Sequence, residues 1–85
     1  MKKIPLTQGE VALVDNEDYA RLMEYTWYLL VKPSGRFYAA RNEYGKWGKS
    51  SVTMQRDIMN HPIGKRVTFK NKNSLDCQKE NLVLK

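Results

Sequence analysis

The chain has 85 residues, with 15 Lys and Arg against 9 Asp and Glu, a formal net charge of +6 and one cysteine. A chain of this length forms one small domain that buries only about 60–65% of its unfolded surface. The hydrophobic fraction of 41% is too high for a disordered tail. No apolar run approaches the roughly 20 residues that cross a membrane, and Met1–Pro5 is not followed by the apolar stretch of a signal peptide.

Cysteine and histidine usage excludes two common ways of stabilising a small protein. Cys77 is the only cysteine and His61 the only histidine, so neither an internal disulfide nor a zinc finger can form. We therefore expect a cytoplasmic protein of a reducing compartment, with no metal site, no cofactor and no membrane partner.

The charge is distributed unevenly along the chain. Residues 1–30 hold three bases and five acids, a net of −2, whereas residues 31–85 hold twelve bases and four acids, a net of +8. The basic part also contains Tyr38, Tyr44, Trp47 and Phe69. Basic residues interleaved with aromatic ones are typical of a protein that binds a phosphate backbone, although a basic surface kept for solubility has the same composition.

The first third of the chain predicts a strand and a helix. Residues 10–15 are rich in β-branched residues and follow Gly9, which indicates a strand. Asp15 can cap a helix, and Tyr19, Leu22 and Met23 follow at helical spacing, so the helix is expected over about 16–25. The acids there are interpreted as capping residues rather than as a catalytic carboxylate pair.

The middle of the chain predicts an antiparallel meander. Residues 26–32 are β-branched and aromatic, Pro33-Ser34-Gly35 is turn chemistry, and residues 36–44 form the returning strand. A second turn over 45–49 leads to a third strand over 50–54. Strict alternation of the returning strand places Arg36 and Arg41 on opposite faces. In the second turn Trp47 either folds back onto the sheet edge or stays exposed to meet a base, a sugar or a partner.

The last third predicts β, turn and α elements. Residues 55–59 can form one or two helical turns, which end before the Asn60-His61-Pro62 turn because the residue before proline avoids the helical region. Residues 66–69 read as a short strand and 71–74 as a polar turn. Asp76 can cap a final helix over 77–81, which an apolar tail over 82–84 would close.

These last segments resemble the phage-type HNH endonuclease family. Three segments resemble three motifs of the family. The family's M-H-R-x-I-M corresponds to Met54-Gln55-Arg56-Asp57-Ile58-Met59-Asn60, and its V-D-H-I-N-G-N corresponds to Val67-Thr68-Phe69-Lys70-Asn71. Its L-D-N-R-x-E-N-L-R corresponds to Leu75-Asp76-Cys77-Gln78-Lys79-Glu80-Asn81-Leu82-Val83-Leu84. The resemblance implies a degenerate ββα unit over 55–85. It also implies a phage or mobile-element protein located in the host cytoplasm.

The first part of the chain looks like the usual companion of that family. Its residues are Ile4-Pro5-Leu6-Thr7-Gln8-Gly9, Ala12-Leu13-Val14-Asp15, Glu17-Asp18-Tyr19 and Trp27-Tyr28-Leu29. The resemblance implies a small sheet domain over 1–54 that is likened to the ethylene-response-factor DNA-binding domain. The expected fold is therefore α+β: a three- to four-stranded antiparallel sheet with a short helix, followed by the ββα segment.

The departures from the family fall on its chemistry. The resemblance places the metal-binding aspartate on Thr68, the histidine that activates water on Phe69, and the first motif histidine on Gln55. Of the functional set, only Asn81 is kept. Phenylalanine can neither accept a proton nor bind a metal, and a neutral hydroxyl is a poor ligand for a hard cation. We therefore expect a homologue that is not an enzyme.

Two other reactive side chains are weak candidates for a replacement site. His61 lies in the turn before Pro62, eight positions before Phe69, and is interpreted as an exposed turn residue. Cys77 has Lys79 and Arg66 in its region, but no general base accompanies it.

The leading interpretation is a catalytically inactive HNH-like protein that binds nucleic acid, most readily double-stranded DNA. The lysines would contact phosphates, and Arg36 or Arg41 would read a base in the major groove. Of these two arginines, which lie on opposite faces, Arg41 is chosen as the base-reading residue. Two alternatives stay open: an inhibitor or adaptor that binds a host protein, and a residual nuclease with an unforeseen metal site. The predicted contact residues are Arg36, Arg41, Lys46, Trp47, Lys49, Arg56, Lys65, Arg66, Lys70 and Lys72.

Overall fold

The computed structural model describes all 85 residues and begins with a two-stranded ribbon. Strand β1 (Lys2–Pro5) pairs antiparallel with β2 (Val11–Val14), with Ile4 opposite Ala12. A 3₁₀ turn, η1 (Thr7–Gly9), joins them. β2 matches the predicted strand, whereas β1 was not predicted because Ile4 is its only buried residue and its neighbours are exposed. A single apolar residue produces no detectable alternation.

Helix α1 (Asn16–Leu22) follows β2 and ends three residues before the predicted end. Asp15 occupies the N-cap position, although its side chain makes no capping hydrogen bond. The helix stops at Leu22 because the chain turns there, and the indole Nε1 of Trp27 donates a hydrogen bond to the Leu22 carbonyl at 2.7 Å. A buried side chain thus satisfies one of the carbonyls that a helix end leaves free.

The predicted meander is confirmed as a three-stranded sheet in the order β3-β4-β5. Its strands are β3 (Tyr28–Val31), β4 (Phe37–Gly45) and β5 (Gly48–Thr53), all antiparallel. The Pro33-Ser34-Gly35 turn joins β3 to β4, and Gly35 has a φ of +90°, a backbone angle that favours glycine.

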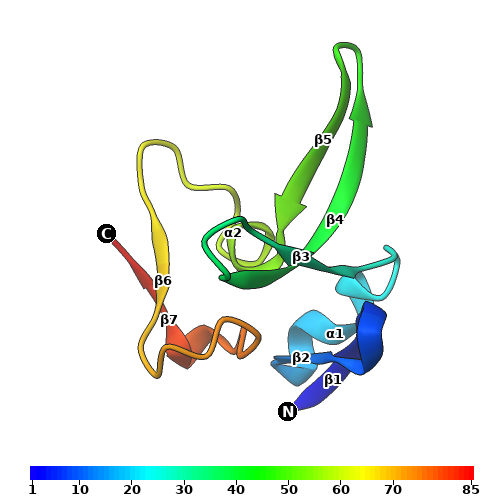
Figure 1. Ribbon diagram of the computed structural model, residues 1–85. Coiled ribbons are helices and arrows are strands. Elements are labelled where there is room, and N and C mark those ends of the chain that lie inside the picture. The colour runs from blue at the N-terminus through cyan, green and yellow to red at the C-terminus, as the bar shows by residue number, and fades with distance from the viewer.

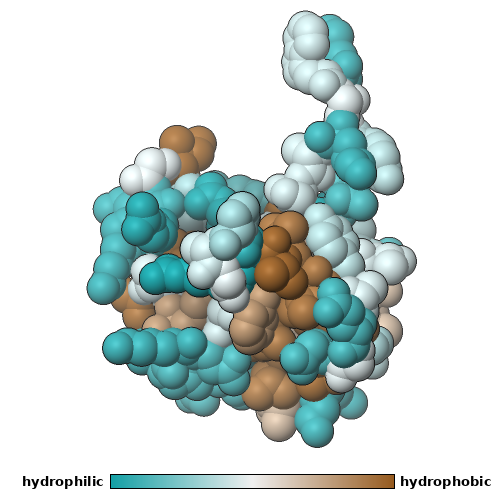
Figure 2. Space-filling model, in the orientation of Figure 1, coloured by the Kyte–Doolittle hydropathy of each residue, from teal (hydrophilic) through white to brown (hydrophobic).

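The outer parts of β4 and β5 extend away from the rest of the molecule as a hairpin, which we call the arm (residues 42–51). Every residue from 42 to 51 is exposed. Figure 1 shows the arm projecting from the body, and Figure 2 shows that its surface is mostly hydrophilic or neutral. The inner part of β4 is the reverse, because three consecutive residues, Ala39 to Arg41, are buried.

The last third begins with helix α2 (Met54–Ile58), which confirms the predicted helical turns. Strand β6 (Val67–Phe69) follows, and a 3₁₀ turn η2 (Lys79–Asn81) leads into β7 (Leu82–Leu84), which pairs antiparallel with β6. The predicted helix over 77–81 is therefore wrong. Residues 75–77 run beside β2 instead: Cys77 N donates to Leu13 O at 2.7 Å, and Leu13 N donates to Leu75 O at 2.8 Å.

The fold is α+β, with three antiparallel sheets of two, three and two strands and two short helices. The α+β class and the three-stranded sheet agree with the prediction, whereas the sheets β1-β2 and β6-β7 are additional to it. No helix is long and apolar enough to cross a membrane. Both the first and the last part of the chain contribute to one core, which contains Ile4, Ala12, Val14, Leu22, Trp27, Ala39, Met54, Ile58, Val67, Leu75, Cys77 and Leu82.

Candidate nucleic-acid interface

Most basic side chains of this protein have no acidic partner. Among the 15 Lys and Arg residues, only Arg21, Arg41 and Lys79 lie within ion-pair distance of a carboxylate. The acids Asp18 and Asp57 are both engaged in these pairs. The remaining twelve cations outnumber the carboxylates that have no ion-pair partner, so the molecule keeps a net charge of +6. These cations are Lys2, Lys3, Lys32, Arg36, Lys46, Lys49, Arg56, Lys65, Arg66, Lys70, Lys72 and Lys85.

Five of these unpaired cations surround one cleft. It has a volume of about 940 Å³ and lies between the β3–β4 turn, the junction of β5 with α2, and strand β6. None of its lining residues is acidic, so the field inside it is positive. We call it the basic cleft; its cations are Lys32, Arg36, Arg56, Arg66 and Lys72.

A second hollow adjoins the basic cleft. It has a volume of about 630 Å³, shares Arg66 and Thr68 with the cleft, and adds Lys65 and Lys85. Its lining also contains no acidic side chain. The two hollows therefore form one continuous basic surface around Thr68, the residue on which the family resemblance places the catalytic aspartate.

Arg56 also has a structural role within this surface. Its guanidinium donates hydrogen bonds to Pro62 O at 3.0 Å and to Lys65 O at 3.2 Å, and so holds the loop between α2 and β6. That loop includes Asn60 and His61 at φ of +64° and +53°, angles that non-glycine residues adopt at a cost. Arg56 brings charge to the cleft, but two of its donors are already used.

Arg41 is not on the surface, which corrects its assignment as a base-reading residue. It is 8% exposed, and its Nε donates to Asp57 Oδ2 at 3.2 Å. Its guanidinium also lies over the rings of Tyr25 and Trp27, 4.1 and 5.9 Å from their centroids. Because these contacts engage the guanidinium inside the protein, Arg41 is a buried, ion-paired cation, and we do not include it among the proposed DNA contacts.

The predicted residues of the second turn all lie on the arm. Lys46 and Trp47 form its two-residue tip, and Lys49 is paired with Tyr44 one step further along the strands. The Trp47 ring is 93% exposed, so it does not fold back onto the sheet edge. The Nζ of Lys46 lies 5.7 Å from the ring centroid.

Three of the four positions on which the resemblance places the family's functional residues line the basic cleft. Thr68 is half-buried and donates its hydroxyl to Val83 O at 3.5 Å. Phe69 stacks on Tyr38 with a centroid distance of 6.5 Å. Gln55 lines the cleft and is buried. These three side chains hold neither a carboxylate nor an imidazole toward the cleft, so they supply no metal ligand set and no general base.

Asn81, on which the resemblance places the metal-binding asparagine, is hydrogen-bonded within the protein. Its Nδ2 donates to Asn71 Oδ1 and to Asp76 O, both at 2.9 Å, and its Oδ1 accepts a hydrogen bond from Asn71 N at 3.0 Å. Asn71 in turn donates to Asp76 Oδ2. Asn81 therefore ties the β6–η2 loop together.

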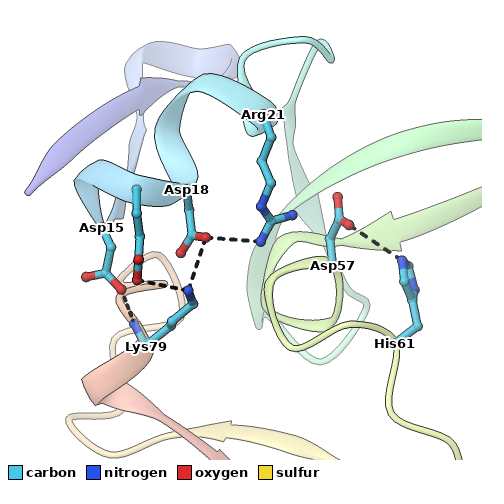
Figure 3. A network of polar contacts seen from close by, with 7 residues as sticks. Asp15, Asp18, Arg21, Asp57, His61 and Lys79 are labelled. Atoms are coloured by element: carbon cyan, nitrogen blue, oxygen red, sulfur yellow. Dashed lines mark hydrogen bonds and ion pairs between the residues drawn. The ribbon is translucent and has the colours of Figure 1, made fainter.

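The only group of acids that could hold a metal lies at the start of α1, away from the basic cleft. The carboxylates of Asp15, Glu17 and Asp18 have ligand atoms within 4.8 Å of one another. Lys79 is already paired with the group: its Nζ lies 3.0 Å from Glu17 and 3.3 Å from Asp18, and its backbone N donates to Asp15 (Figure 3). The hydrogen bonds of the Lys79 ammonium group to Glu17 and to Asp18 raise the pKa of Lys79. These ion pairs connect η2 to α1.

The two other reactive side chains considered from the sequence differ in exposure: Cys77 is buried and His61 is exposed. Cys77 is fully buried, and burial raises its pKa from 9.0 to about 12, with the Asp76 carboxylate adding to the effect. A thiol of that kind is not a nucleophile at neutral pH. His61 is exposed and lies 3.5 Å from Asp57, the partner of Arg41.

The structure brings together five of the ten predicted contact residues. Arg36, Arg56, Arg66 and Lys72 line the basic cleft, and Lys65 lines the adjoining hollow. Lys46, Trp47 and Lys49 form a separate group on the arm, Lys70 is exposed but lines neither hollow, and Arg41 is buried. Sequence reasoning missed Lys32 and Lys85. Lys32 directly precedes the turn that ends at the predicted contact Arg36, which is the signal that could have included it.

Comparison with models of protein families, with curated proteins and with solved structures finds no match for this chain. The resemblance to the HNH endonucleases stays a prediction that rests on the motif residues.

Proposed function

We propose that the protein binds double-stranded DNA through the basic cleft and the adjoining hollow, and that it does not cleave the DNA. The observation that carries this proposal is the grouping of Lys32, Arg36, Arg56, Arg66 and Lys72 around one cleft without any acidic side chain. A surface used only for solubility does not need to gather unpaired like charges around a hollow, because they repel one another when no polyanion is present.

Binding would be mainly electrostatic. Each phosphate that a lysine or arginine neutralises releases condensed counterions, which favours binding at low salt. Arg36 and Arg66 are exposed and have no hydrogen-bonded partner for their guanidinium groups, so both are free to form bidentate contacts with phosphate oxygens. Arg36 takes over the base-reading role that was predicted for either Arg36 or Arg41, because Arg41 is buried.

The proposal that the protein is inactive rests on the side chains around the cleft. A metal-dependent nuclease needs carboxylate oxygen for its cation and a base for its water. Thr68 and Phe69 offer neither, and Asn81 is held by Asn71 and Asp76. The proposed role is that of a non-cleaving, HNH-like protein of a phage or mobile element which occupies DNA.

Salt dependence tests the proposal first. Affinity for a random-sequence duplex of about 20 base pairs is measured by fluorescence anisotropy from 50 to 200 mM salt. Neutralisation of four or five phosphates predicts a slope of roughly −4 in log K against log salt, about −0.9 per phosphate. A flat response, or no binding at 50 mM salt, contradicts DNA binding and favours the alternative of a protein partner.

Variants of the cleft locate the binding surface. Arg36→Ala and Arg66→Ala should each weaken binding and lower the magnitude of the salt slope by about one unit. Lys3→Ala is the matched control, since Lys3 is also exposed and unpaired but lies on β1 and lines neither hollow. Equal effects of Lys3→Ala and Arg66→Ala would show that binding does not use the cleft.

A further inference from the structure

The arm makes little contact with the folded body, and its one side-chain hydrogen bond to the body is donated by the Tyr28 hydroxyl to Asn42 Oδ1 at 3.2 Å. Residues 42–51 are exposed on both faces of the hairpin, and none belongs to the core or packs against it. A two-stranded hairpin without a packed face is only marginally stable by itself. The arm is long and projects from the body (Figure 1), but it adds no side chain to the core.

The tip of the arm presents one flat aromatic ring. Gly45 and Gly48 pair across the hairpin, so Lys46 and Trp47 alone form the turn. Gly48 has a φ of +110°, an angle that L-residues rarely adopt, and this glycine lets the strands close so tightly. The indole is 93% exposed, and Lys46 Nζ lies 5.7 Å from the ring centroid.

A ring with this exposure and these neighbours suits the face of a nucleobase. Aromatic side chains stack on bases irrespective of sequence, and the cations Lys46 and Lys49 favour the phosphates beside a base. Within an intact duplex the base faces are covered by neighbouring pairs and only base edges line the grooves. The ring can therefore stack only where a base is already exposed or where the duplex is forced open.

The gain from stacking and the cost of opening the duplex together decide which DNA structure the ring favours. Stacking of one ring on one base strengthens binding by about 5- to 150-fold, whereas opening a base step weakens it by a comparable factor. The arm tip has only one ring to offer, because Tyr44 lies on the strand and not in the turn. The gain is therefore kept in full only when the base is unstacked before the protein arrives.

We propose that Trp47 stacks on an unpaired base, so that the arm directs the protein to DNA in which a duplex adjoins a single-stranded segment. The basic cleft would hold the duplex and the arm would engage the unpaired base. This inference rests on the proposed function, since the arm alone carries few charges.

The test compares two DNA molecules that share one duplex sequence, one with blunt ends and one with a single-stranded tail of about six nucleotides. Wild-type protein should bind the tailed DNA more tightly by about 5- to 150-fold. Trp47→Ala should remove this preference and leave the affinity for blunt duplex unchanged. Tyr44→Ala is the matched control: it removes another exposed aromatic side chain of the arm, 77% exposed, and should keep the preference.

Tryptophan fluorescence supplies a second measurement. Trp27 is 3% exposed and hydrogen-bonded inside the core, so Trp47 is the only tryptophan that solvent quenchers can reach. Adding tailed DNA should quench the emission and protect it from acrylamide, while blunt duplex should do so far less. Circular dichroism of Trp47→Ala should match that of the wild type, because the ring has no packing contacts to lose.

The outcomes separate this inference from the proposed function. Salt-dependent binding of both DNA molecules with equal affinity overturns base stacking and leaves duplex binding intact. An equal loss on both DNA molecules in Trp47→Ala shows a groove contact, and likewise overturns stacking. If neither DNA is bound at 50 mM salt, the proposed function and the inference fall together.

Discussion

Replacement of Arg41 by alanine should destabilise the protein severely without changing how the folded molecule binds DNA. The side chains of Arg41 and Asp57 are 9% and 12% exposed, and their ion pair of 3.2 Å links β4 to α2. The guanidinium also covers the ring of Tyr25, 4.1 Å from its centroid. Alanine would leave Asp57 in a largely buried position with only the contact to His61 at 3.5 Å.

The magnitude follows from this geometry. Removing one member of a buried ion pair costs about 3–5 kcal/mol because the other charge stays desolvated, and the lost cation–π contact adds up to about 1 kcal/mol. His61, when protonated, offsets part of this cost. A loss of about 3 kcal/mol compares with a total stability of about 4–13 kcal/mol for this length, and corresponds to a fall in Tm of about 12–24 °C.

Urea and thermal denaturation, each followed by circular dichroism, measure the effect. Arg36→Ala is the control, because Arg36 is an exposed arginine just before the same strand and should change stability by less than about 0.5 kcal/mol. The double variant Arg41→Ala/Asp57→Ala should lose less than the sum of the single variants. A loss below 1 kcal/mol in Arg41→Ala, or a loss of DNA affinity that depends on sequence while the fold is intact, would refute the assignment of Arg41 to the core.

Two further predictions concern the C-terminal part of the chain. Lys79→Met should lower Tm at neutral pH, since it removes the cation shared by Glu17 and the buried Asp18 and leaves Asp18 with Arg21 alone. A Tm equal to that of the exposed-lysine control Lys70→Met would contradict a stabilising role of these ion pairs. The free energy of unfolding should also fall as the pH rises from 9.0 toward 12. The pKa of Cys77 is 9.0 in the unfolded chain, and burial raises the pKa to about 12 in the folded protein. The unfolded chain therefore loses this proton first, which favours unfolding over that pH range. Cys77→Ala, measured by urea denaturation over this range, should flatten the decline, and native Cys77 should react with a thiol reagent only as fast as the protein opens.

Local signals sufficed for the meander. The β-branched and aromatic run before Pro33 and the glycine at Gly35 predict strand, turn and strand without reference to the rest of the chain, and the structure confirms them. The exposure of Trp47 was one of two possibilities left open by the sequence. A tryptophan between two turn glycines has no neighbouring apolar residues to cover it, and the structure shows it exposed.

The elements that depend on distant partners could not be predicted. Asp76 is a capping residue before residues 77–81, and this local signal predicts a helix there. In the structure, Leu82–Leu84 pair with β6 on one side of this segment, and Cys77 is hydrogen-bonded to Leu13 on the other. Pairing of residues so far apart in sequence overrides a weak local helix preference. Strand β1 also depends on a partner: its backbone is extended because it pairs with β2.

Burial of a charge is the other feature that the sequence hides. Alternation assigns Arg41 to one face of β4, but at the base of the arm both faces of the strand are covered, and Ala39, Ala40 and Arg41 are all buried. Its partner Asp57 and its ring Tyr25 lie sixteen residues away on either side in sequence. The unpaired surface cations were easier to anticipate, because charged side chains without partners stay exposed.

The central claim, that DNA binds in the basic cleft, is tested most directly by NMR of uniformly ¹⁵N-labelled protein titrated with a short duplex at low salt. The account predicts amide shift changes concentrated at Lys32, Arg36, Arg66, Thr68 and Lys72, with α1 unaffected. Shift changes centred on α1, or a spectrum that duplex DNA leaves unchanged at 50 mM salt, would contradict it.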